Sequence, residues 1–454
     1  MGWKSLVSMG LALVSSPLAA EDDESAEALF GQWLPVFNIG DDAAIRSFYE
    51  TRLSNPNPAY ELDLRRSSCG LDPVRVLSSD ASEHVVLAAE RCFPALVRIT
   101  VRIIDGENGR RTIIPLHPYN LSPEGAANYT LAAAAREAEA SSFAGIVMIV
   151  PGEGEPWAQA FGSADLEGNR PITPDTPFLL ASAGKMFTTV ALLQLVEQGK
   201  IDLDAPLGRY LPDYPNAQTR EEVTIRHLLT HRDGTGDMGI LRREHGENRA
   251  RVRSLADIVA LNAERDPVFE PGTQTAYGSY GMLLLGLVVE AVSGEDYYAY
   301  IQRHVFDPAG MADAGFPLLS EMDDVAVGLT TFYGQESELM PNLDVLPWRG
   351  TPGGGGVASA SDMVAFFAAL KHGTLLSPAM LAQAVTPSEA FGWGLGFVVS
   401  PGQSWGHGGN SYGMDVAIHQ YLPNDTLFVC LATRDHACNR MILNWYLRQF
   451  GLDE

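Results

Sequence analysis

Apolar residues recur every three or four positions after Lys185, and this spacing predicts an amphipathic helix that ends before Gly199. The apolar face consists of Met186, Val190, Leu193 and Val196. Ser182 stands at the amino end of the predicted helix. Because Ser182 and Lys185 are three positions apart, their side chains lie over the same side of the first turn. The pattern therefore places a hydroxyl and an amine side by side at a helix terminus.

This pair suits nucleophilic catalysis. A serine hydroxyl is a weak nucleophile until a nearby base takes its proton. A lysine in a closed site, beside the positive end of a helix, loses its proton more easily than a solvated lysine does. The alternative is an N-capping serine beside a solvated lysine, since the S-x-x-K spacing also occurs by chance.

Residues 21–118 have the pattern of a small α+β domain. Apolar positions predict two helices followed by a meander of strands, at 30–37, 45–49, 74–77, 84–88 and 95–104. The W-L-P-V-F-N-I-G-D start resembles the small NTF2-like (cystatin-like) domains that precede some bacterial hydrolases. A turn at 105–109, a loop at 115–123 and an alanine-rich connector helix within 119–141 follow. We expect this domain to act as a scaffold or to bind a partner.

Residues 142–454 have a different pattern. Apolar runs predict strands near both ends of this region, whereas helices and loops fill residues 187–390. The predicted strands are 145–150, 157–162, 393–399, 414–421 and 426–431, and a last helix covers 438–450. Strands at both ends of a helical middle imply one antiparallel sheet completed by distant segments. We therefore expect an α+β fold, an antiparallel sheet flanked by helices with a large helical subdomain.

Charge and the first residues indicate an exported protein. The net charge of −25 argues against nucleic-acid partners and anionic membranes. Lys4, an apolar stretch at 6–14 and small residues ending at Ala20 predict a signal peptide over residues 1–20, cleaved near Ala20. We expect a location in the bacterial periplasm or outside the cell. The next apolar run, 282–292, is too short to span a bilayer, so no stable membrane anchor is expected.

The cysteines allow two interpretations. In an exported chain, the four cysteines can form two local disulfides, Cys69–Cys92 and Cys430–Cys438. Local pairing is the simpler interpretation, and buried free thiols are the alternative because apolar residues surround Cys430.

Two further segments form a constellation with Ser182-x-x-Lys185. Residues 271–280 read P-G-T-Q-T-A-Y-G-S-Y, and residues 406–410 read G-H-G-G-N. These segments resemble the serine β-lactamase and penicillin-binding-protein superfamily, whose sites combine S-x-x-K, Y-x-N and K-T-G. The most similar members are class C-like serine hydrolases, namely esterases, D-amino-acid peptidases and β-lactamase-related proteins. The resemblance covers residues 142–454, with further matches at 225–231 and 353–356.

The resemblance implies a role for each matching residue. Ser182 is the acylated nucleophile, and Lys185 is its base. Tyr277 relays protons to the leaving group and from the deacylating water, although an aromatic plug ahead of an apolar helix would leave the same pattern. The backbone N–H groups of Ser182 and Asn410 form the oxyanion hole. No cofactor is implied.

Two positions depart from the family pattern. Ser279 stands where the family often has asparagine, and it either hydrogen-bonds Lys185 or substrate, or caps the following helix. His407 replaces the lysine of K-T-G and is expected to bind substrate with Gly408 and Gly409. A neutral histidine holds a substrate carboxylate less firmly than a lysine does, although it can donate a hydrogen bond. Esters, amides or peptides are therefore favoured over β-lactams.

His227 and His231 form the H-x-x-x-H pair of zinc peptidases. However, Leu228 occupies the place of their general-base glutamate, and no third ligand suggests itself. We expect no metal, with His227 packed on its helix and His231 opening a loop at 232–236 that rims the pocket.

Two functions fit the sequence. The first is an exported, metal-free serine hydrolase that acts through a Ser182 acyl-enzyme on a small-molecule ester, amide or peptide. The second is a catalytically weak protein of the same fold that binds cell-wall fragments or a protein partner. The intact Ser182, Lys185 and Tyr277 set favours the first, because a binding module has little need of all three.

Overall fold

The computed structural model describes two compact units, which divide near residue 120. The described residues are 25–39, 41–52, 62, 65, 69–91, 96–106, 109–113, 116–118, 122–140, 142–237, 252–331, 339–343, 346–388, 392–439, 441, 442 and 445. The signal peptide predicted over residues 1–20 and the predicted disulfide partner Cys92 lie outside these residues.

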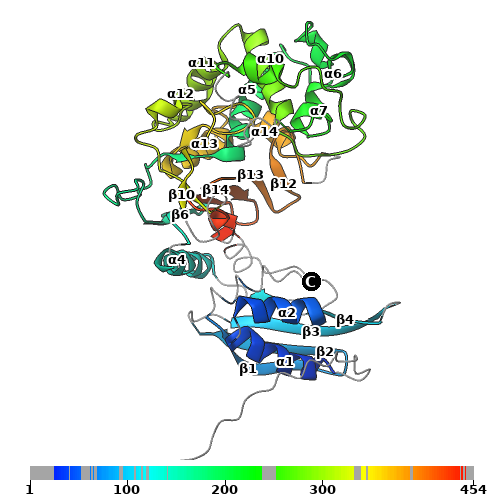
Figure 1. Cartoon of the computed structure of the whole chain (residues 1–454), viewed down its shortest axis with the longest axis vertical. Coiled ribbons are helices and arrows are strands. Elements are labelled where there is room, and N and C mark those ends of the chain that lie inside the picture. The colour runs from blue at the N-terminus through cyan, green and yellow to red at the C-terminus, as the bar shows by residue number, and fades with distance from the viewer. Residues whose placement is uncertain are drawn as a thin grey trace, which may run out of the picture. The chain divides into compact units, whose positions relative to one another are not determined.

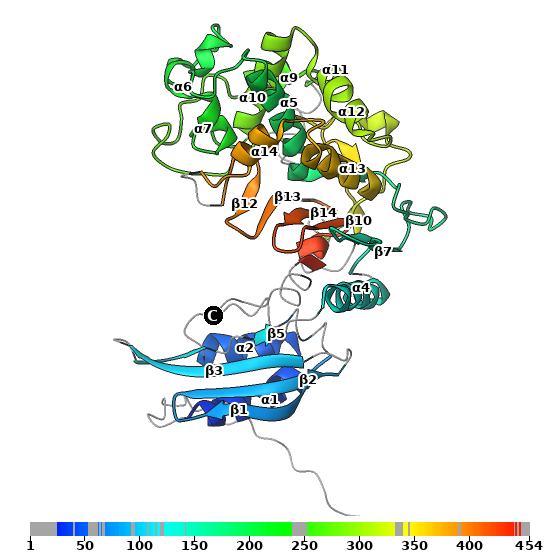
Figure 2. The ribbon, with the colours of Figure 1, turned by 180° about the vertical axis from the view of Figure 1, so that it is seen from behind.

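The first unit is a pair of helices on an antiparallel sheet. Helices α1 (Ala26–Ile39) and α2 (Asp42–Arg52) lie on one face of the sheet, as the two opposite views show (Figure 1, Figure 2). The strands are β1 (Leu71–Ser79), β2 (Glu83–Glu90), β3 (Leu96–Gly106), β4 (Gly109–Ile113) and β5 (Leu116–Pro118), in the order β1-β2-β3-β4 with β5 also paired to β3. Trp33 and Phe37 of α1 pack against Val86 and Ile99 of the sheet.

The helices and the three-strand meander confirm the predicted order of elements. Strands β3 and β4 pair up to Gly106 and Gly109, on either side of the turn expected at 105–109, whereas β5 lies within the loop expected at 115–123. Residues 110–112 are polar and carry no apolar alternation, so this strand forms by pairing with β3 rather than from its own pattern. The resemblance to NTF2-like domains stays a prediction.

The second unit is built on a six-stranded antiparallel sheet. Its strands are β12 (Val398–Ser400), β13 (Ser404–Ser411), β14 (Met414–Tyr421), β15 (Thr426–Ala432), β6 (Gly145–Val150) and β7 (Trp157–Phe161), in that spatial order. Strand β15 pairs with β6, so segments from the two ends of the region complete one sheet as predicted.

Both faces of this sheet are covered, which explains the nearly continuous apolar sequence of β6. Ile146 and Met148 face the larger core, which contains the helical part, whereas Val147 and Ile149 face α4 (Pro123–Glu139) and Trp445. Alternate residues therefore enter opposite cores, and neither set is polar. Of the last predicted helix, the described residues 437–439, 441, 442 and 445 are helical.

Helices and short strands fill the region between β7 and β12. The helices that position the site are η1 (Ala181–Gly184), α5 (Lys185–Glu197), α7 (Ile225–Leu229), α10 (Tyr280–Ser293) and α13 (Ala360–Lys371). The others are η2 (Leu207–Arg209), α6 (Ala217–Glu222), α9 (Leu255–Ala260), α11 (Tyr297–Ile301), η4 (Gln302–Phe306), α12 (Asp307–Ala309), η5 (Leu319–Glu321) and α14 (Pro378–Ala384). The short strands are β8 (Phe178–Leu179), β9 (Leu329–Thr330), β10 (Met340–Pro341) and β11 (Val357–Ala358). Within the ranges given above, no helix is long and apolar enough to cross a membrane.

One predicted strand is wrong in its extent. The prediction at 393–399 is reduced to β12, because Gly392 and Gly396 have left-handed φ angles of 81° and 71° that interrupt an extended chain. Conversely, the segment 406–410 was expected to lead into a strand, but it lies inside β13. Its three glycines have low strand propensity, so the sequence pattern does not predict a strand here. The strand forms by pairing with β14.

Candidate active site

Ser182 lies in the one-turn helix η1, immediately before α5. The segment 353–356 packs directly against this turn, because Gly355 N–H donates to Ala181 O at 2.7 Å. A Cβ on Gly184 would approach Gly355 O to 2.1 Å, so the close contact between the two backbones requires glycine there. The glycine run noted in the sequence therefore supports the turn that carries Ser182.

Lys185 begins α5, and its side chain is buried with 1 % exposed. Its Nζ lies 3.1 Å from Ser182 Oγ, 3.1 Å from Ser279 Oγ and 2.5 Å from Gly353 O. Burial lowers the pKa of Lys185 to about 7, although the nearby Asp237 acts in the opposite direction. A neutral amine has two hydrogens and one lone pair. If the hydrogens bond to Gly353 and Ser279, the lone pair faces the Ser182 hydroxyl.

Ser279 occupies the N-cap position of α10, but its side chain makes no capping hydrogen bond. Its hydroxyl instead contacts Lys185. Of the two alternatives left open by the sequence, the contact with Lys185 is the one observed.

Tyr277 lies beside this pair, with its ring centroid 4.8 Å from Lys185 Nζ. The ring stacks on Trp393 at 5.4 Å and contacts the His231 ring at 4.7 Å. Desolvation raises the pKa of the Tyr277 hydroxyl to about 12 even though 47 % of the residue is exposed, and hydrogen bonding with Ser182 acts in the opposite direction. The hydroxyl therefore stays protonated at neutral pH.

Strand β13 lies against the turn that carries Ser182. A Cβ on Gly409 would lie 2.3 Å from Leu180 O and 2.9 Å from Ser182 N, so only glycine allows this approach. Strand β12 pairs with β13 only from Ser404 to Gly406, so the rest of β13, from His407 to Ser411, is not paired with β12. Asn410, beyond that point, lines a cavity together with Ser182.

His407 is buried with 3 % exposed, and burial lowers its pKa to about 3. Its Nδ1 is bonded to Gly408 O, and because a carbonyl can only accept, the proton sits on Nδ1. Nε2 is then a lone-pair acceptor, and it has no hydrogen-bond partner among the residues that the structure describes. His407, Gly408 and Gly409 do not line the cavity.

The cavity beside Ser182 has a volume of about 300 Å³. Tyr277, Ser279 and Asn410 line it together with apolar residues, among them Leu179, Met322, Leu346, Pro347 and Met414. Asp237 also lines it, whereas none of its described lining residues is a lysine, arginine or histidine.

Sequence reasoning did not predict how two aromatic residues, His231 and Trp393, pack at the site. His231 was assigned to a loop, but it is buried between Tyr277 and Trp393, with ring centroids 4.7 and 4.4 Å away. Trp393 was assigned to a strand. The aromatic character of both was visible, but their meeting depends on the tertiary fold. His227 packs at its helix start as expected, with its backbone N–H bonded to Thr224 Oγ1 at 3.1 Å.

The described part of the chain holds no group of three or more histidine, cysteine or acidic residues arranged to bind a metal.

Comparison with known proteins gives consistent matches for the second unit. The family model described as Beta-lactamase matches residues 131–451. The chain is 33 % identical to PbpX of Bacillus subtilis over 275 residues, which are 59 % of this chain and 64 % of PbpX, so it spans less than two thirds of that relative. It is 31 % identical to esterase EstB of Burkholderia gladioli over 292 residues, 56 % of this chain and 74 % of EstB. A solved penicillin binding protein from Bacillus halodurans is 28 % identical with a TM-score of 0.61, covering 68 % of this chain and 98 % of that protein.

Proposed function

Because the chain belongs to the beta-lactamase family, we propose that it hydrolyses small esters or amides through an acyl-enzyme on Ser182. Its family and its relatives make it a serine hydrolase as a class. The observation that carries the finer proposal is the buried Lys185 amine, 3.1 Å from the Ser182 hydroxyl and beside Tyr277 at the wall of a cavity.

Acylation begins when neutral Lys185 takes the proton of Ser182. Since the pKa of Lys185 is about 7, about half of the molecules hold this base near neutral pH. Ser182 Oγ bonds to the substrate carbonyl carbon, and the carbonyl electrons move to the oxygen. Backbone N–H groups of Ser182 and Asn410 stabilise that oxyanion, and such donors contribute about 10²–10³ in rate each.

The tetrahedral intermediate collapses when the bond to the leaving group breaks. Tyr277, whose hydroxyl stays protonated, gives its proton to the leaving oxygen or nitrogen and recovers one from Lys185. In deacylation a water transfers a proton to the same pair while its oxygen bonds to the acyl carbon. Ser182 Oγ then leaves, regains a proton, and the product acid is released.

The chemistry of the cavity favours uncharged acyl groups. Its wall is largely apolar, its described lining has no basic side chain, and Asp237 contributes a carboxylate. His407 is neutral, and its free nitrogen is an acceptor. A substrate carboxylate therefore gains no charge-assisted hydrogen bond from these groups, whereas a neutral ester needs none. The similarity to an esterase supports this preference.

A hydrolysis screen tests the proposal. Purified protein and Ser182→Ala are compared on p-nitrophenyl acetate and butyrate, D-amino-acid p-nitroanilides and nitrocefin. We expect turnover of at least one ester or amide by the wild type and none by the variant. Binding of cell-wall fragments without turnover of any substrate would favour the alternative, a catalytically weak binding protein.

We further propose that the chain is exported after cleavage near Ala20 and that its first unit is an NTF2-like domain. The disulfide between Cys430 and Cys438, with Cys69 also disulfide-bonded, supports an oxidising compartment. Cell fractionation with and without residues 1–20 tests export. A cytoplasmic location of the full-length protein would contradict it.

A further inference from the structure

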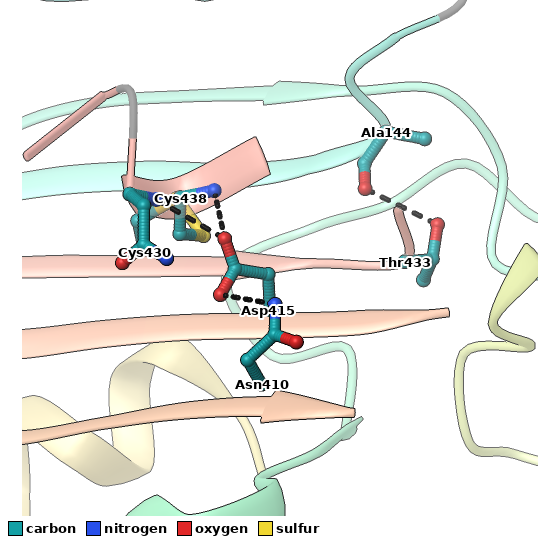
Figure 3. The surroundings of a disulfide bond; sticks show 7 residues. Ala144, Asn410, Asp415, Cys430, Thr433 and Cys438 are labelled. Atoms are coloured by element: carbon teal, nitrogen blue, oxygen red, sulfur yellow. Dashed lines mark hydrogen bonds between the residues drawn. A yellow bond between two sulfur atoms is a disulfide. The ribbon is translucent and has the colours of Figure 1, made fainter. Parts of the chain in front are cut away.

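Asn410 of β13 and Asp415 of β14 lie opposite each other, next to the turn that joins the two strands. Asp415 is buried with 1 % exposed, and its Oδ1 accepts a hydrogen bond from Asn410 Nδ2 at 3.3 Å. Figure 3 shows the two side chains facing each other across the hairpin. A buried carboxylate thus contacts the side chain of a residue that lines the cavity.

The second oxygen of Asp415 binds a segment far along the chain. Its Oδ2 accepts from the backbone N–H groups of Cys438 at 2.7 Å and Asn439 at 3.1 Å (Figure 3). Cys438 is disulfide-bonded to Cys430 in β15, the strand next to β14. The two N–H donors are therefore held by a covalent link to the same sheet that carries Asp415.

A second carboxylate joins the same two segments. Asp435 Oδ1 accepts from Gly413 N–H at 2.7 Å, and its Oδ2 accepts from Thr330 Oγ1 at 2.8 Å. The other side of the Asn410 amide is also occupied, since Nδ2 lies 3.3 Å from His436 Nδ1. The hairpin is thus fixed to residues 435–439 on several sides.

We propose that Asp415 is a positioning residue of the oxyanion hole: it fixes Asn410 to the segment that the Cys430–Cys438 disulfide anchors. This inference rests on the proposed function, in which the Asn410 backbone N–H is the second donor. A displacement of about 1 Å in a catalytic group can cost about 10² in rate, so a device that fixes this donor has a measurable effect. Burying a carboxylate is unfavourable unless its hydrogen bonds compensate, and Asp415 satisfies both oxygens in this link.

Asp415→Asn tests the link, because a carboxamide cannot accept from the two backbone donors and from Asn410 in the same arrangement. Asn410→Ala removes the link from the other side while keeping the backbone N–H. For p-nitrophenyl butyrate we expect kcat to fall about 10- to 100-fold in each variant, with KM within about twofold. Affinity for a boronic acid that forms a tetrahedral adduct with serine should fall by a similar factor. The double variant should be no slower than the slower single variant.

Asp296→Asn is the matched control. Asp296 also accepts from two successive backbone N–H groups, those of Tyr298 and Ala299, but it makes no contact with Asn410. It should leave kcat unchanged. A Cys430→Ala/Cys438→Ala variant should lower kcat, with no further loss when Asp415→Asn is added.

A lowered melting temperature with wild-type kcat in Asp415→Asn would overturn the inference, and so would losses that multiply in the double variant. Fluorophosphonate labelling of the wild type distinguishes a failure of the positioning role from a failure of the proposed function. Labelling of Ser182 with unchanged kcat in Asp415→Asn defeats the positioning role alone, whereas absence of labelling and of turnover defeats the proposed function and the inference together.

Discussion

The Lys185 amine nitrogen lies 3.1 Å from the Ser182 hydroxyl oxygen, and the lysine is buried with 1 % of its surface exposed. Burial lowers the pKa of this amine to about 7, against the opposing charge of Asp237. The burial that holds this amine beside Ser182 therefore also sets the pH at which the base becomes available.

The first prediction concerns the pH dependence of activity. Because the base must be neutral, kcat/KM for a neutral ester should rise about tenfold per pH unit below pH 7 and level off above it. His231 and His407, the histidines nearest the site, have pKa values of about 3, so their titration does not cause the rise in activity between pH 5 and 7. Initial rates from pH 5 to 9 check this. A flat profile would contradict the assignment of Lys185 as the base.

The second prediction concerns Lys185 and Tyr277 together. Lys185→Ala and Tyr277→Phe should each lower kcat at least about 10²-fold, because both take part in proton transfer. The double variant should be little slower than the slower single variant, since groups that act as a unit are not additive. Steady-state kinetics of the three variants decide the matter. Losses that multiply would show that the two residues act independently.

The sequence predicted the Ser182–Lys185 pair because their contact is local. Residues three apart on a helical turn meet whatever surrounds them, and the apolar face that follows marks the helix. The sheet was predictable for the same kind of reason, since β6 and β15 are dense apolar runs. The placement of strands at both ends of the region predicted one sheet completed by distant segments, and the structure shows that β6 and β15 are the strands that join them.

Contacts between distant segments could not be read in this way. Whether Ser279 caps α10 or reaches Lys185 depends on how α10 packs against α5. His231 and Trp393 meet only because their loops approach each other in the folded chain. Strand β13 escaped prediction because Gly406, Gly408 and Gly409 have low strand propensity. The lack of a Cβ on Gly409 is what lets the strand approach Ser182.

The third prediction concerns specificity. Unmodified protein should hydrolyse p-nitrophenyl esters with a higher kcat/KM than nitrocefin, because the described lining of the cavity has no basic side chain to bind a carboxylate. His407→Lys combined with Ser279→Asn should shift this ratio toward nitrocefin, since the longer lysine side chain brings a charged donor to the cavity that His407 does not line, and such a donor adds about 1–2 kcal/mol for a carboxylate. Ser293→Asn, at the carboxyl end of α10 and so at the opposite end of the helix from Ser279, is the control and should leave the ratio unchanged. Efficient nitrocefin turnover without esterase activity in the wild type would contradict the specificity account.

The fourth prediction concerns stability. His231 has a pKa of about 3 when folded, because burial disfavours its charged form, and an ordinary value near 6.5 when unfolded. The unfolded chain therefore binds the extra proton, and the free energy of unfolding falls as the pH drops from 7 to 5. In His231→Phe this fall should be smaller by up to about 1.4 kcal/mol per pH unit. Urea unfolding at several pH values measures it.

His372→Gln, at an exposed position, is the control for that experiment and should leave the pH dependence unchanged. His231→Phe should also keep more activity at pH 8 than His231→Ala, because the phenyl ring retains the packing against Tyr277 and Trp393. Equal activity losses in the two variants would mean that ring packing does not support Tyr277.

The central claim is that Ser182 becomes covalently acylated. Intact-protein mass spectrometry after brief incubation with a fluorophosphonate, followed by peptide mapping, tests it most directly. We predict a single adduct on the peptide that contains Ser182 and no adduct in Ser182→Ala, with both proteins folded by circular dichroism. An adduct that persists in Ser182→Ala, or ester hydrolysis at the wild-type rate by that variant, would contradict the claim.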